Sequence, residues 1–210
     1  MNRNKCIEHL ESGDGKLQEK AALLFHLVDD GYSILPLMVE KAKAIDVNNG
    51  PIELSASNFV GYAAKQSARL IRQQGYSRAD EFHRRIKDWI FGLNYCSEIN
   101  AAGHSVTALG NLWTPPESVR ERLIELAGGD VRSDNPLEHP GGTMRCLAFR
   151  ELSSLDRETA IRLIDTPARY DFETFIDHRL DYYRTNFPKN VKAPKALKSE
   201  IAWLTDACGG

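Results

Sequence analysis

The sequence has few cysteines, no long apolar run and almost no net charge. Its four cysteines, Cys6, Cys96, Cys146 and Cys208, include no Cys-x-x-Cys pair, which argues against a disulfide-stapled secreted domain. The longest apolar run, 32–39, is far shorter than the roughly 18 to 20 residues that span a bilayer. The formal net charge of −2 excludes a strong general attraction to nucleic acid or anionic lipid.

Several familiar sequence signals are also missing. The first residues turn acidic before any apolar segment develops, so no secretory signal is visible. Phosphate-binding and dinucleotide-binding glycine loops are absent, and so is the Gly-x-Ser-x-Gly nucleophile elbow. We therefore expect a cytoplasmic, soluble protein that is not embedded in a membrane and that carries no cofactor.

The apolar residues that are present recur at helical spacing, and no segment alternates in the manner of a strand. The most regular stripe contains Phe82, Ile86, Trp89 and Leu93, and we predict that Trp89 is buried. A Thr-Pro-Pro-Glu start signal at 114–117 marks another helix clearly. Helices are predicted over 17–28, from a Ser33 cap to the break at 48–51, and over 58–74, 77–103, about 114–127, 144–152 and 156–164, with further helices from Thr166 to before Pro188 and around 197–208.

One irregular segment interrupts this pattern. Residues 128–143 are rich in Gly, Pro, Asp and Asn and lack periodicity, so we expect a long loop that is either functional or mobile. The sequence thus predicts an all-α, multi-helix bundle of about seven to nine helices, forming a single domain over 1–210. An internal boundary, if present, would lie at this loop and separate a main bundle, 1–127, from a C-terminal helical part, 144–210.

Two features are candidate binding sites. Lys65, Arg69 and Arg72 follow one face of the predicted 58–74 helix and could contact phosphates or an acidic partner protein. An ordinary solvated helix face explains the same residues. His139, in the loop, could act as an acid or base, although the sequence offers no partner nucleophile for it.

Metal ligands are present only in weak patterns. Cys6-x-x-His9 could supply two zinc ligands, with Cys96 and His104 as distant partners, but the spacing does not match a closed zinc site. Glu173, Asp177 and Asp181 share a helix face with His178, but we find no second such helix, and a solvated acidic stripe is the simpler interpretation. We predict no metal site.

The segment from Arg78 to His83 resembles the Arg-x4–6-His signature of the HEPN family, a group of small all-helical proteins. The resemblance covers six residues. It implies a metal-independent ribonuclease in which Arg78 and His83 act on the scissile phosphate across a dimer cleft. On one helix these two residues point about 140° apart, so both subunits would be needed.

The leading interpretation is a non-enzymatic intracellular helical module that acts through protein–protein interaction, using helix faces and the long loop. The first alternative is the HEPN-like ribonuclease. The second is nucleic-acid binding through the basic face over 65–87.

Overall fold

The structure, a computed structural model, describes residues 1–49, 51–74, 81–112, 116–128 and 144–164. These residues form α-helices and one short 3₁₀-helix, with no strand among them, which confirms the all-α fold. The elements are α1 (Arg3–Glu11), α2 (Gly15–Leu23), η1 (Phe25–Leu27), α3 (Gly31–Lys43), α4 (Leu54–Gln74), α5 (Glu81–Leu93), α6 (Ile99–Leu109), α7 (Pro116–Gly128), α8 (Met144–Leu155) and α9 (Arg157–Ile164).

The chain divides into two compact units, Met1–Glu121 and Arg122–Gly210, and the division falls within α7. Most of the segment at which we predict an internal boundary, 128–143, lies outside the described residues. None of the helices in the described ranges is long and apolar enough to cross a membrane.

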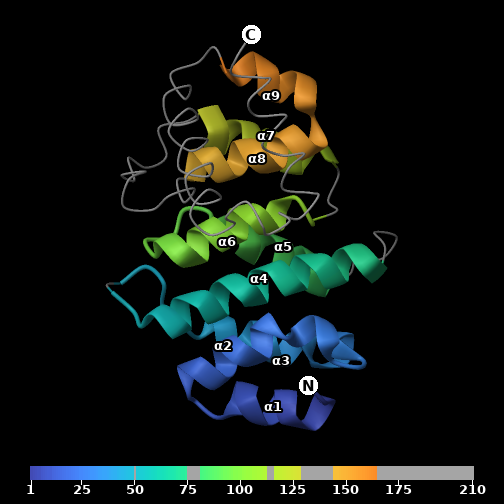
Figure 1. Cartoon of the computed structure of the whole chain (residues 1–210), viewed down its shortest axis with the longest axis vertical. Coiled ribbons are helices and arrows are strands. Elements are labelled where there is room, and N and C mark those ends of the chain that lie inside the picture. Colours follow the sequence, from blue (N-terminus) through green and yellow to red (C-terminus); the bar gives the residue numbers. More distant parts are fainter. Residues whose placement is uncertain (50, 75–80, 113–115, 129–143, 165–210) are drawn as a thin grey trace, which may run out of the picture. The chain divides into compact units, whose positions relative to one another are not determined.

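Helix α4 is the centre of the first unit. It packs against α2 and α3 and also against α5 and α6, and Figure 1 shows it between these two pairs. The side-chain amide of Asn58 donates a 2.9 Å hydrogen bond to Glu19, which ties α4 to α2. Phe59 is fully buried and anchors the apolar face that the periodicity predicts. The helix begins four residues before the predicted start of 58.

Helices α4 and α6 approach each other closely because their buried positions carry small side chains. Ala63 and Ala68 of α4 and Ala101 and Ala108 of α6 are completely buried. Small residues allow two helix backbones to come together without leaving cavities. This pair therefore forms the dense part of the core.

The predicted helix over 17–28 is wrong in its second half. Asp14 caps α2 by accepting hydrogen bonds from two backbone N–H groups, but α2 ends at Leu23 and η1 follows it. Asp30 then adopts the left-handed conformation, with φ of 52°, and α3 begins at Gly31 rather than after a Ser33 cap. A side chain at Gly31 would crowd the buried ring of Phe25, since a Cβ would lie 3.2 Å from it. Gly31 therefore starts the next helix.

The predicted helix over 77–103 is two helices in the structure. Helix α5 ends at Leu93 and α6 begins at Ile99, while residues 75–80 lie outside the described part of the chain. In the connection, the backbone N–H of Glu98 donates to the carbonyl of Val47, and the Glu98 side chain accepts from Asn100 N–H at the start of α6. The break is therefore stabilised by the chain segment that follows α3, which helical periodicity alone does not reveal.

The described part of the second unit agrees with the predicted helices. Helix α7 covers the predicted span to within about a residue at its C-terminus, and α8 packs against α9. Asp156 caps α9 by accepting hydrogen bonds from the backbone N–H of Thr159, at 3.0 Å, and from its hydroxyl, at 2.7 Å. Phe149 is buried in this unit. The helices predicted beyond Thr166 lie outside the described residues.

Candidate functional site

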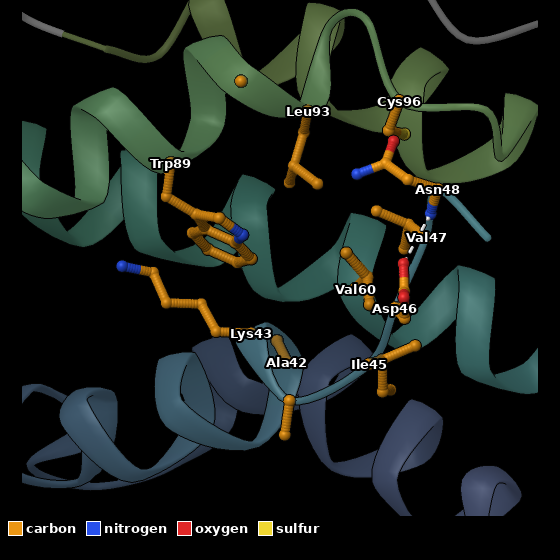
Figure 2. A pocket seen from close by; sticks show the side chains of 12 residues that line it. Ala42, Lys43, Ile45, Asp46, Val47, Asn48, Val60, Trp89, Leu93 and Cys96 are labelled. Atoms are coloured by element: carbon orange, nitrogen blue, oxygen red, sulfur yellow. Dashed lines mark hydrogen bonds between the residues drawn. The ribbon is translucent and has the colours of Figure 1, made fainter.

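A cavity of about 500 Å³ opens in the first unit, between the C-terminal end of α3, the middle of α4 and the second half of α5. Its volume is within the range of roughly 300 to 1,000 Å³ that is common for ligand pockets. Figure 2 shows Val60 and Leu93 between two more polar ends. The cavity is lined by Ala42, Lys43, Ala44, Ile45, Asp46, Val47, Asn48, Val60, Trp89, Gly92, Leu93 and Cys96.

Trp89 and Lys43 form one end of the cavity. The ammonium nitrogen of Lys43 lies 5.9 Å from the centre of the Trp89 ring, within the range of a cation–π interaction. Lys43 is exposed as a residue, but partial burial lowers the pKa of its ammonium group, and the nearby Arg85 lowers it further. The indole is half-buried rather than buried, so our prediction for Trp89 is wrong. Its position at a cavity wall explains the difference.

Asp46 and Asn48 form the other end. One carboxylate oxygen of Asp46 accepts a hydrogen bond from the backbone N–H of Asn48 at 3.0 Å, and the other accepts from the side-chain amide of Asn49 at 2.6 Å. These donors lower the pKa of the Asp46 carboxyl group because they stabilise its charged form. The carboxylate is thus already engaged by its own loop.

Cys96 lies beside this end, in the connection between α5 and α6. Its thiol is buried and donates a 3.3 Å hydrogen bond to the carbonyl oxygen of Glu98. Cys96 falls within the helix predicted over 77–103, whereas the structure places it after the end of α5. It therefore helps to close the cavity rather than continuing a helix face.

The predicted basic face lies on α4, away from this cavity's lining. Arg69 and Arg72 are exposed, and Lys65 is half-buried. Lys65 lies close enough to His104 of α6 to help lower the pKa of that imidazole to about 4, although burial is the larger cause. His139 lies outside the described residues.

His83 is an interior residue with only 7% of its surface exposed. Its Nε2 atom and the hydroxyl oxygen of Tyr32 are 2.6 Å apart and share a hydrogen bond, and the two rings meet edge to face. A catalytic imidazole needs access to its substrate, so this geometry favours a structural role. Arg78, its partner in the HEPN-like hypothesis, lies outside the described residues.

The residues that define the cavity were not recognised as a site in the sequence. Lys43 and Asp46 look like ordinary exposed residues near a helix end, and Trp89 looks like part of a core stripe. The chain segments that meet here, 42–48 and 89–96, are separated by all of α4. Within the described ranges, no three His, Cys, Asp or Glu side chains are grouped as metal ligands.

No protein-family model matches the chain, and comparisons with curated proteins and with solved structures give no match either.

Proposed function

We propose that this chain is a protein-interaction module and that the α3–α5 cavity receives a side chain of its partner. The observation that carries the proposal is the half-buried indole of Trp89, which lines the cavity together with the apolar side chains of Val60 and Leu93. Tryptophan is enriched among residues that dominate binding energy, because its large apolar surface gains most when a partner removes it from water.

The surface beside the cavity supports a protein partner. Tyr95 is 41% exposed and stands in the connection between Leu93 and Cys96, both of which line the cavity. Tyrosine and tryptophan are enriched in protein interfaces, since each combines a broad apolar ring with a polar group. A partner that inserts one side chain beside Trp89 would have a second aromatic residue available close by in the chain.

Gly92 provides a direct test because it lines the cavity and a Cβ atom there would meet nothing within 4 Å. Gly92→Leu should therefore fold normally while it fills the mouth of the cavity. The full chain, immobilised as wild type, Gly92→Leu, Trp89→Ala or Lys20→Ala, is used to capture proteins that are then identified by mass spectrometry. Lys20 is exposed on α2, outside the cavity lining and the basic face of α4, and its substitution is the matched control.

The proposal expects specific proteins that are retained by wild type and by Lys20→Ala and are lost with Gly92→Leu and Trp89→Ala. Circular dichroism and thermal unfolding confirm that each variant is folded. Capture that is unchanged by both cavity variants, or absent from all four baits, would contradict it.

A further inference from the structure

The positive charge in the cavity lining is the ammonium group of Lys43, and its contacts differ from those of the other polar groups there. Within the described residues Lys43 has no salt bridge and no hydrogen bond to its ammonium group, and its contact is the face of Trp89. Partial burial is the main cause that lowers the pKa of Lys43; the nearby Arg85 lowers it further, and Asp88 raises it by less than Arg85 lowers it.

The opposite end of the cavity carries the charged carboxylate of Asp46, which its own loop already engages. Both oxygens of Asp46 accept hydrogen bonds from the loop that contains them, through Asn48 and Asn49. The side-chain oxygen of Asn48 in turn accepts a 3.4 Å hydrogen bond from the backbone N–H of Ser97. This end is therefore a set of mutually satisfied groups, whereas the ammonium group at the Trp89 end has unused donors.

Resting on the proposed function, we propose that the partner is a peptide segment in which an acidic side chain, Asp or Glu, stands next to a large apolar one. The apolar side chain packs between Trp89 and Leu93, and the carboxylate accepts hydrogen bonds from Lys43. This arrangement matches two chemical features of the site, an apolar wall and, at its edge, a cation that makes no salt bridge within the described residues. A segment with a basic side chain would meet repulsion from Lys43 and Arg85.

The test selects phage-displayed random heptapeptides on the purified full chain, with Gly92→Leu as the parallel negative target. We expect wild type to enrich peptides that contain Asp or Glu beside Leu, Ile, Phe or Trp. Lys43→Gln should keep the apolar preference and lose the acidic one, and Lys43→Glu should replace it with Lys or Arg. Lys41→Gln, on the same helix but outside the cavity lining, should select like wild type.

Affinity measurements on the most enriched peptide sharpen the result. Fluorescence anisotropy should show about tenfold weaker binding to Lys43→Gln, a typical effect for one lost charge pair. The same loss is expected when the peptide's acidic residue is changed to its amide, and combining both changes should add little further.

The two proposals fail in different ways. The selected peptides could be apolar and bind wild type but not Gly92→Leu, yet show no preference for acidic residues, or a preference for basic ones. Either result would overturn this inference and leave the proposed function standing. If the selection yields no peptide that binds wild type better than Gly92→Leu, both proposals are contradicted. Self-association of wild type that Gly92→Leu abolishes would assign the cavity to a second copy of the chain and also overturn the inference.

Discussion

Gly61 of α4 lies so close to His104 of α6 that a Cβ atom at position 61 would be 2.5 to 2.8 Å from the Cβ and ring of the histidine. Such distances are shorter than real contacts, and His104 Cβ cannot move without its helix. The missing side chain at Gly61 therefore sets how closely these two helices pack. The imidazole of His104 is half-buried, and its ring lies 4.8 Å from that of Tyr62.

Gly61→Ala should destabilise the protein by about 1 to 3 kcal/mol, because overpacking forces α4 and α6 apart. The free energy of unfolding in urea measures this. Gly92→Ala is the matched control, since its Cβ would meet open space, and it should be neutral or stabilising by up to about 1 kcal/mol. Equal effects of the two substitutions would show that the helix contact does not require glycine.

Stability should fall as the pH falls from about 6.5 toward 4. The pKa of His104 is lowered from 6.5 to about 4 by burial and by Lys65, so in this window the unfolded chain binds a proton that the folded chain excludes. This histidine should contribute a loss of up to about 3 kcal/mol. Urea unfolding at several pH values, compared with His104→Gln, measures the contribution. A variant with the same pH slope as wild type would assign the effect to other groups.

Trp89→Ala should cost about 1 to 2 kcal/mol, less than the roughly 3 to 5 kcal/mol expected for a fully buried aromatic residue. The reason is that Trp89 is half-buried at the cavity wall. Phe59→Ala is the comparison, because Phe59 of α4 is completely buried. Guanidinium unfolding of both variants gives the two losses in free energy of unfolding. A larger loss for Trp89→Ala than for Phe59→Ala would show that Trp89 is a core residue.

Tyr32→Phe removes the hydroxyl that shares a 2.6 Å hydrogen bond with His83. Since His83 is buried, losing this hydrogen bond should cost about 1 kcal/mol. A double-mutant cycle with His83→Ala isolates the interaction, and we expect a coupling energy of about 1 kcal/mol. Unchanged stability of Tyr32→Phe would show that this hydrogen bond does not hold the fold together.

The Cys6 thiol should resist modification in the folded protein. It is completely buried, and burial raises its pKa to about 11, so very little reactive thiolate is present at neutral pH. A variant with the other three cysteines changed to serine isolates its reaction with a disulfide reagent at pH 8. Labelling should require unfolding conditions, and rapid labelling of the native variant would show that α1 opens readily.

The sequence by itself determined where most of the described helices lie and that no strand accompanies them. Helices α7, α8 and α9 follow from local signals, such as the prolines before Glu117 and the capping Asp156, and these act within a few residues. The apolar face of α4 is equally local, because Phe59 and Ala63 recur at helical spacing and both are buried.

Only the tertiary structure decided where α5 ends and what Trp89 does. The stripe of α5 continues in the sequence to Cys96, but the helix stops because the following connection bonds to Val47, which arrives from the end of α3. The same meeting of distant segments leaves Trp89 beside Lys43 at an open cavity instead of in the core. Periodicity indicates which face of a helix is apolar. Whether another helix covers that face depends on contacts between residues far apart in the chain, which periodicity does not contain.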